Sequence, residues 1–227
     1  MPRRALRKLD PTIDLSGILL QPEDVPRPWD AQRLFGRTAP LQVEVGSGKG
    51  LFLENAAAAD PASNFFGIEV AGKYARRCAE RLAKRSLTNG RMLAGDALWL
   101  FRDVLPDACV ADVHVYFPDP WWKARHHKRR VLNGPFVADV TRVLLPGGRL
   151  HFWTDVREYY EATLELLAAE TPLEGPHSVD ARPAEHDLDY RTHFERRTRK
   201  AGEPVYRCQF TKPAAGPPVS ATDTPAG

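Results

Sequence analysis

The residues best suited to chemistry lie in one short stretch, where a carboxylate is set among prolines, aromatic residues and cations. The stretch reads Phe-Pro-Asp-Pro-Trp-Trp-Lys, with Asp119 held between Pro118 and Pro120. Five Lys or Arg residues then fall within eight positions: Lys123, Arg125, Lys128, Arg129 and Arg130. A fixed carboxylate can accept hydrogen bonds from a base edge, aromatic rings can stack on bases, and cations can bind phosphates. The combination favours a nucleic-acid site over an ordinary solvated charge run.

A glycine-rich turn follows the first predicted strand of the chain. The sequence Gly-Ser-Gly-Lys-Gly begins at Gly46 and includes Gly48, and Glu44 lies just before it. Glycine allows the backbone of such a turn to approach a ligand closely. The Gly-x-Gly-x-Gly spacing matches neither the dinucleotide fingerprint nor a P-loop, which argues against an NAD-dependent dehydrogenase.

Acidic residues recur where the following strands end. Glu69 ends the second predicted strand, and Asp96 and Asp119 follow the third and the fourth. Because the carboxyl ends of parallel strands share one edge of a sheet, these acids should meet where such sheets bind ligands. Glu69 suits the two hydroxyls of a ribose, Asp96 could face an adenine amino group, and Glu44 could neutralise a cationic ligand. The alternatives are that Asp96 caps the next helix and that Glu44 pairs with Lys49.

The elements that position these residues begin near Leu41. Strands are predicted over 41–45, 64–69, 91–94, 110–117 and 149–154, and helices over 49–59, 71–86, 97–104, 133–145 and 156–170. Pro146-Gly147-Gly148 is expected to separate a helix from a strand. This alternation predicts an α/β fold with a mostly parallel sheet and helices on both faces. Residues 172–191 are predicted to be a loop and 205–211 a final, antiparallel strand.

The two ends of the chain differ from this domain. Residues 1–40 carry six prolines and little periodicity, so we expect an arm that wraps the domain or is partly disordered. Residues 213–227 are almost entirely Pro, Ala, Gly, Ser and Thr, a composition typical of a disordered tail. The folded domain is therefore assigned to residues 41–212.

The composition is that of a soluble globular protein, with 43% hydrophobic and 27% charged residues in a chain of 227. The net charge of +3 is weak support for a nucleic-acid partner. Three isolated cysteines without a Cys-x-x-Cys pair argue against a disulfide framework and a zinc site, and favour a reduced cytoplasm. With no apolar run near membrane-spanning length and no signal-peptide pattern, we expect a cytoplasmic protein without a metal or a membrane partner.

The residues described above resemble a known family. The glycine turn and strand-end acids are similar to those of class I S-adenosyl-L-methionine-dependent methyltransferases, which have a Rossmann-like fold. The Phe-Pro-Asp-Pro-Trp-x-Lys-x-x-His-x-Lys-Arg-Arg block is narrower and closely resembles the bacterial tRNA (guanine-N7-)-methyltransferase family, which methylates the guanosine at position 46 of the variable loop. The resemblance runs from about Leu41 to Phe210 and includes Thr154-Asp155 and Thr192-His193-Phe194-Glu195.

This resemblance implies a role for each matching residue. The methyl donor, S-adenosyl-L-methionine, would be contacted by Glu44, Gly46, Gly48, Glu69, Asp96 and Asp119, with Asp119 also the active-site residue. The tRNA substrate would be contacted by Lys123, Asp155, Thr192, His193, Phe194 and Glu195. The cations at 125, 128, 129 and 130 would bind its phosphates. Trp122 and His193 depart from the family pattern, which leaves the local loop shape in doubt. The family contains monomers and homodimers, and no obligatory protein subunit is expected.

The chemistry agrees with these roles. Guanine N7 carries an in-plane lone pair and no proton, so methylation there needs no general base. We therefore expect Asp119 to orient the guanine and to stabilise the positive charge that develops on it. Asp155 could bind the guanine edge or cap the helix at 156–170, and either Trp121 or Trp122 could stack on a base.

Other functions remain open from the sequence alone. The alternatives are a methyltransferase acting on another RNA, on a protein or on a small molecule, and a non-catalytic RNA-binding protein. The basic block argues against a protein or small-molecule substrate. The retained glycine turn and strand-end acids argue against a protein without catalytic activity.

Overall fold

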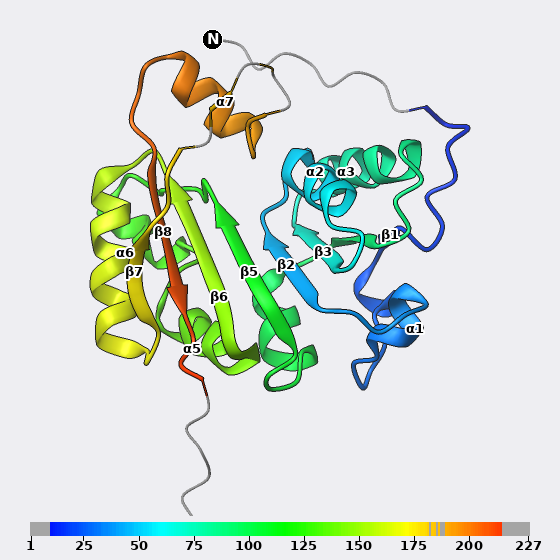
Figure 1. The fold of residues 1–227 in the computed structure, drawn as a ribbon, viewed down its shortest axis with the longest axis horizontal. Helices are drawn as coiled ribbons and strands as arrows, with labels where there is room; N and C mark the ends of the chain where they lie inside the picture. The colour runs from blue at the N-terminus through cyan, green and yellow to red at the C-terminus, as the bar shows by residue number, and fades with distance from the viewer. Residues whose placement is uncertain (1–9, 182, 185, 187–188, 215–227) are drawn as a thin grey trace, which may run out of the picture.

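The centre of the molecule is a single eight-stranded sheet (Figure 1). The computed structural model describes residues 10–181, 183–184, 186 and 189–214. Its strands are β1 (Leu19–Leu20), β2 (Leu41–Val45), β3 (Asn64–Glu69), β4 (Gly90–Ala94), β5 (Val110–Tyr116), β6 (Leu144–Thr154), β7 (Glu174–Ser178) and β8 (Tyr206–Thr211). The order is β1-β4-β3-β2-β5-β6-β8-β7, parallel as far as β6, with β8 antiparallel to both of its neighbours. The predicted fold class is confirmed.

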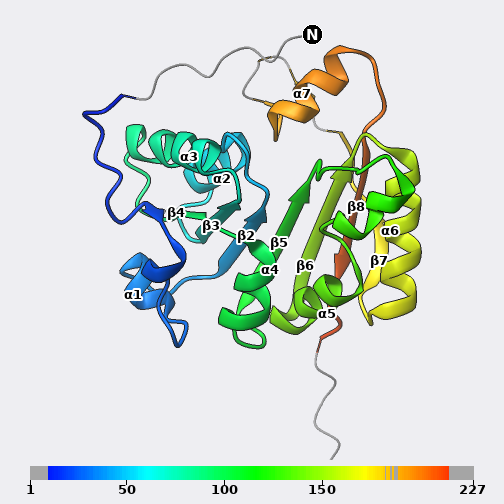
Figure 2. The ribbon, with the colours of Figure 1, turned by 180° about the vertical axis from the view of Figure 1, so that it is seen from behind.

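Helices cover both faces of the sheet (Figure 2). They are α1 (Ala31–Phe35), α2 (Leu51–Ala59), α3 (Gly72–Lys84), α4 (Ala97–Trp99), α5 (Gly134–Val143), α6 (Arg157–Glu170) and α7 (His193–Lys200), with 3-10 turns at Pro22–Asp24 and Ala124–Arg129 and a π turn at Leu100–Val104. Helices α2 and α3 pack against Phe65 and Met92 on one face. Helices α5 and α6 pack against Val113 and Phe152 on the other.

The arrangement gives the molecule two distinct ends. The carboxyl ends of β2, β5 and β6 point towards the end where α7 lies, and α1 lies at the opposite end (Figures 1 and 2). The candidate residues at the strand ends are therefore gathered on the α7 side.

Three predicted elements need correction. Helix α5 ends at Val143, and Leu144 already pairs with Val110 in β6, so Pro146-Gly147-Gly148 is an irregularity inside the strand rather than a stop before it. The register against β5 shifts at this point, and the turn requires glycine, since a Cβ at Gly148 would lie 2.8 Å from the carbonyl oxygen of Leu145. The predicted loop at 172–191 contains β7, which pairs with β8. Helix α7 and strand β1 were not predicted.

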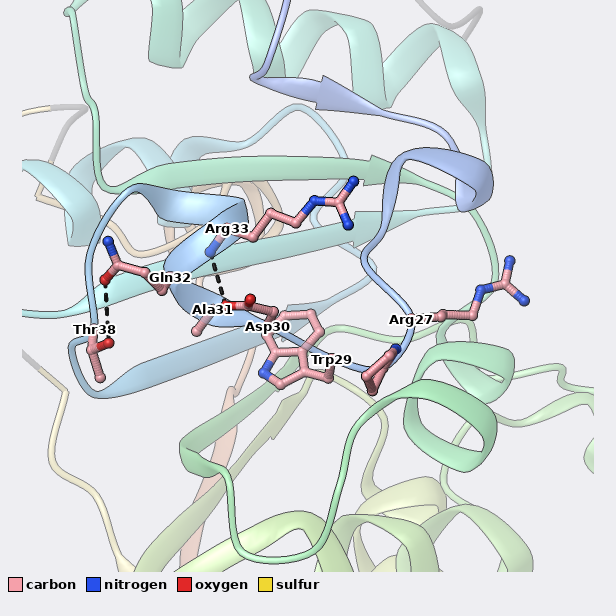
Figure 3. Close-up of a pocket in the computed structure, with 8 residues that line it drawn as sticks. Arg27, Trp29, Asp30, Ala31, Gln32, Arg33 and Thr38 are labelled. Carbon is pink, nitrogen blue, oxygen red and sulfur yellow. Dashed lines mark hydrogen bonds between the residues drawn. The ribbon is translucent and has the colours of Figure 1, made fainter.

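Residues 10–40 lie against the domain. Strand β1 pairs with β4, Leu34 and Phe35 of α1 are buried, and Trp29 packs on Phe66 with ring centroids 5.9 Å apart. A hollow of about 440 Å³ lies beside α1, lined by residues 27–33 and Thr38 (Figure 3). It is remote from the strand ends that carry the candidate residues. Residues 1–9 and 215–227, which include most of the predicted tail, lie outside the described part of the chain.

Within the described ranges, no helix has the length and apolar character needed to cross a bilayer. Nor do His, Cys, Asp and Glu side chains of those residues form a group of three that could hold a metal ion.

Candidate active site

The glycine turn is shaped by its backbone conformation. Gly46, Gly48 and Gly50 have φ angles of 77°, 53° and 74°, in the left-handed region that a residue with a Cβ rarely adopts. The turn is fastened to the next strand, because the amide of Gly48 donates to Oε2 of Glu69 at 2.9 Å. The other oxygen of Glu69 accepts from the amide of Ala71 at 2.8 Å. The prediction that Glu69 ends its strand is confirmed, and the amides of Gly48 and Ala71 hold both of its oxygens in place.

Glu44 is the most unusual acid of the site. Its side chain is buried, and its Oε2 has no hydrogen-bond partner among the described residues. Burial raises the pKa of Glu44 to about 8, an effect reduced by a hydrogen bond from Ser47 and increased by the nearby charge of Glu69. The alternative pairing with Lys49 is not formed, since Lys49 is exposed. An unpaired buried carboxylate is costly and is matched by a cationic ligand group.

Asp96 and Asp119 are both exposed at the ends of their strands. Oδ1 of Asp96 accepts from the amide of Leu98 at 2.9 Å and caps α4, so the capping alternative is confirmed. Its other oxygen, Oδ2, has no hydrogen-bond partner among the described residues. Asp119 follows β5 in the Pro-Asp-Pro loop. The two acids thus stand on the carboxyl edge, as predicted.

The Pro-Asp-Pro loop is strained at both ends. Phe117 and Trp121 have φ angles of 50° and 49°, which are uncommon for bulky residues and typically cost 1–3 kcal/mol each. The amide of Phe117 donates to the carbonyl of Trp153 at 2.7 Å, which ties the loop to β6. Such strain persists only where surrounding contacts fix the backbone, and it holds Asp119 in one place.

Arg130 supplies a second anchor for this loop. Its Nε donates to the carbonyl of Pro120 at 2.9 Å, and its two terminal nitrogens donate to Glu158 at 3.0 and 2.8 Å. The guanidinium also lies 4.5 Å above the ring of Tyr159. The residue is 7% exposed. The expectation that Arg130 binds an RNA phosphate needs correction, because the residue is buried and all three of its nitrogens already donate to Pro120 and Glu158.

The other cations of the block lie on the surface. Lys123, Arg125, Lys128 and Arg129 are all exposed, in agreement with the prediction of a basic loop beside Asp119. The guanidinium of Arg129 lies 5.0 Å above the Trp121 ring, which is half-buried. Trp122, in contrast, is 72% exposed. Of the two tryptophans, Trp122 is thus the one whose ring can be covered by a base.

Asp155 follows β6 on the same edge. Its Oδ2 accepts from the hydroxyl of Thr198 at 3.4 Å, which links it to α7. It does not cap α6, whose N-cap is Val156 without a side-chain hydrogen bond. The capping alternative for Asp155 is therefore wrong.

The Thr192–Glu195 segment begins α7, and two of its members are occupied within the protein. The hydroxyl of Thr192 caps the helix by accepting from the amide of Glu195 at 2.9 Å. Glu195 is buried and accepts from the amide of Arg191 at 2.7 Å, from Arg207 at 3.1 Å and from Arg199 at 3.3 Å. The expected contact of Glu195 with RNA needs correction, since this carboxylate instead fixes α7 to β8.

The remaining two residues of the segment connect α7 to the rest of the site. Nε2 of His193 lies 3.5 Å from Nη2 of Arg81 on α3. Burial, reinforced by the charge of Arg81, lowers the pKa of His193 to about 4, so this side chain is neutral at pH 7. Phe194 is 48% exposed and stacks on Phe117 with centroids 6.2 Å apart. Helix α7 therefore contacts both α3 and the Pro-Asp-Pro loop.

Sequence reasoning missed Arg191. Its guanidinium lies 5.2 Å above the ring of Trp153 and 5.8 Å above that of Phe52, and it donates to the hydroxyl of Tyr116 at 3.2 Å. No spacing in the sequence relates these four residues, because they come from α2, β5, β6 and the segment before α7. The cluster joins the segment before α7 to α2, β5 and β6.

Comparison with known proteins identifies the family. Residues 38–208 match a family model described as "Putative methyltransferase". The chain is 52% identical over 218 residues to the tRNA (guanine-N(7)-)-methyltransferase of Rhodopirellula baltica, covering 93% of this chain and 80% of that one. The chain belongs to the tRNA (guanine-N7-)-methyltransferase family. A relative of the same name from Aromatoleum aromaticum is 42% identical, and the match covers 91% of this chain and 77% of the relative.

Solved structures agree with this family in fold. The 16S rRNA methyltransferase KamB aligns with a TM-score of 0.57 at 17% identity, covering 80% of this chain and 92% of that one. A SAM-dependent O-methyltransferase from Thermotoga maritima gives 0.52 at 16% identity, with 88% and 68% covered. The class I fold is shown, and with membership of the family it confirms S-adenosyl-L-methionine as the methyl donor.

Proposed function

We propose that this protein transfers a methyl group to N7 of the guanosine at position 46 in the tRNA variable loop, in the cytoplasm. The observation that carries the proposal is the 52% identity to a relative of that name, extending over 93% of the chain. The motifs that carry the resemblance, with departures at Trp122 and His193, follow the carboxyl ends of strands in the parallel sheet or begin α7, which supports the proposal. S-adenosyl-L-methionine supplies an electrophilic methyl group on a sulfonium centre.

The residues present fit that donor. Glu44 offers a buried oxygen without a partner, which suits a positively charged group of the ligand. Gly46 and Gly48 leave the turn without side chains, so that a ligand can approach the backbone. We assign Glu69 to the ribose and the free oxygen of Asp96 to the adenine.

We assign Asp119 to the guanine. Because N7 has no proton to remove, the carboxylate has two tasks: to orient the base through its N–H groups, and to stabilise the positive charge that develops on the ring. The strained Pro-Asp-Pro backbone keeps the carboxylate in position without further rearrangement. We also assign Lys123, Asp155 and Phe194 to the RNA; Phe194 stacks on Phe117 at the start of the same loop, and Asp155 follows β6.

The proposal is tested with purified protein, unmodified tRNA transcript and methyl-labelled donor, followed by cleavage selective for 7-methylguanosine. Label at position 46 is the expected result. Label at another nucleotide would refute the position, and label on no RNA would refute the function.

The same assay separates the two tasks of Asp119. Asp119→Ala should lower kcat by about 10²-fold or more, as loss of an electrostatic group in a preorganised site typically does. Asp119→Asn keeps the shape and removes the charge. We expect it to resemble the alanine variant; nearly full turnover would mean that orientation suffices and charge does not matter.

A further inference from the structure

Helices α3 and α7 hold an excess of positive charge that the proposed chemistry does not use. Helix α3 contains five Lys or Arg residues and one acid, and α7 contains four and one, for formal charges of +4 and +3. Together they exceed the net charge of +3 of the whole chain, so the remaining residues sum to −4. These two helices are therefore a second concentration of positive charge, separate from the basic block at residues 123–130.

The acids of these helices do not offset that charge on the surface. Glu80 of α3 and Glu195 of α7 are each 2% exposed. Both are already engaged inside the protein, Glu80 with Arg77 and Lys84, and Glu195 as described above. The exposed charged side chains of the two helices are all cations: Lys73, Arg76, Lys84, Arg197 and Lys200.

The two helices form one surface that adjoins the active site. Arg81 of α3 meets His193 of α7, with nitrogens 3.5 Å apart. At the other side, Phe194 stacks on Phe117 at the start of the Pro-Asp-Pro loop. Both helices lie at the end of the molecule towards which the parallel strands point (Figures 1 and 2). A polyanion bound at Asp119 would continue onto this surface.

From this arrangement we propose that the exposed cations of α3 and α7 bind backbone phosphates of the tRNA beyond the nucleotide that is methylated. The inference rests on the proposed function, which supplies the polyanion. Such contacts carry no base code, and they set the orientation of the folded RNA on the protein. They also release counterions, so that their number is read from the salt dependence of binding.

The test reverses one exposed cation on each helix. Arg76→Glu, Arg197→Glu and the double variant are compared with Arg33→Glu, a matched reversal on α1 at the opposite end (Figure 3). Binding of unmodified tRNA is measured from about 50 to 200 mM salt, the range over which phosphate contacts lose most of their affinity. Thermal unfolding and donor binding verify that each variant is folded.

Each single reversal on the surface should raise the Kd for tRNA about 5–10-fold at low salt and reduce the salt slope by about one. In the double variant the increases in Kd should multiply and the reductions in salt slope should add. The Kd of Arg33→Glu should stay within about twofold of that of the unaltered protein. Equal Kd and slope for Arg76→Glu, Arg197→Glu and Arg33→Glu would overturn the proposal.

The two proposals can fail separately. If the unaltered protein methylates tRNA and the reversals leave binding unchanged, the surface is refuted and the function stands. If the unaltered protein transfers no methyl group to tRNA, the function is refuted. A tRNA affinity that still depends on Arg76 and Arg197 would then support the surface as a tRNA-binding site without this activity.

Discussion

Two glutamates of this protein are almost equally buried, at 3% exposure for Glu44 and 2% for Glu195, yet their surroundings are opposite. Glu195 accepts from one backbone amide and two guanidinium groups. Glu44 has an oxygen with no hydrogen-bond partner among the residues that the structure describes, and burial raises the pKa of Glu44 to about 8. Burial alone therefore does not distinguish a structural carboxylate from a binding one.

The two carboxylates differ in the source of their hydrogen-bonding and charged partners. The partners of Glu195 belong to the chain itself, so folding satisfies the carboxylate and the carboxylate fixes the fold. Within the described part of the chain nothing pairs with Oε2 of Glu44, and a cationic ligand would offset the cost of burying it. On this reasoning, removing Glu195 damages the folded state, whereas removing Glu44 damages binding.

The largest expected effect is that of Glu195→Ala. The change leaves Arg207, whose side chain is 9% exposed, and Arg199 without their acceptor. Removing one partner of a buried ion pair typically costs 3–5 kcal/mol, so the free energy of unfolding should fall by about that amount. Urea denaturation measures it, since the midpoint shifts while the slope stays constant.

The companion variant is Glu195→Gln, which retains an acceptor for Arg207 but no charge. It should lose less than the alanine variant, because a hydrogen bond to the amide oxygen survives. A loss below about 1 kcal/mol for Glu195→Ala would mean that these contacts hold α7 only weakly, and would break the comparison.

Glu44→Gln should act in the opposite direction on stability. With its pKa raised from 4.5 to about 8, folded Glu44 keeps a proton that the unfolded chain has lost between those pH values. Because the folded state then binds more protons, this group makes stability fall as the pH rises through that window. The glutamine variant lacks this loss. It should be more stable by about 4 kcal/mol at pH 8, and nearly equal at pH 4.5.

The same variant should bind the donor less well. A cationic ligand favours the charged form of Glu44, so donor binding at pH 7 should release close to one proton. Calorimetry in two buffers of different ionisation enthalpy measures that release. Glu44→Gln should release no proton and bind at least 10-fold more weakly; an unchanged affinity would show that the cationic group of the donor lies elsewhere.

How far the sequence predicts this site depends on what holds each residue. Glu69 and Asp119 were found because a strand end fixes their position, and the limits of β2 and β3 follow from their apolar runs. Helix α7 was missed because its buried face carries Glu195 and Thr198 instead of apolar side chains, so no hydrophobic period marks it.

Two neighbouring arginines also show what a sequence pattern cannot predict. Arg129 and Arg130 are adjacent and identical in sequence terms, yet only Arg130 is buried. What separates them is Glu158, which lies 28 positions further along the chain and is brought close by the start of α6. Such a pairing is a tertiary contact that no local pattern encodes.

The comparison between buried charged groups with and without partners also applies to Arg130, where we expect the smallest change in stability. Glu158→Ala removes its bidentate acceptor, whereas the hydrogen bond to Pro120 remains. Since the Glu158 side chain is 59% exposed, water can replace part of what is lost, and we expect a cost of about 1 kcal/mol. Glu161→Ala on the same helix is the matched control, because its pair with Arg157 is exposed on both sides; it should cost less than about 0.5 kcal/mol.

The decisive measurement for Arg130 is the division between kcat and KM. If Arg130 positions the Pro-Asp-Pro loop, a loosened guanidinium should lower kcat several-fold for Glu158→Ala, with little change in the KM for tRNA, because Asp119 is displaced while the phosphate-binding surface is intact. If Arg130 instead binds a phosphate of the tRNA, Glu158→Ala should raise the KM for tRNA at constant kcat. A raised KM in Glu158→Ala but not in Glu161→Ala would show that Arg130 contacts the RNA. It would also show that a buried arginine with partners inside the protein can still bind the substrate.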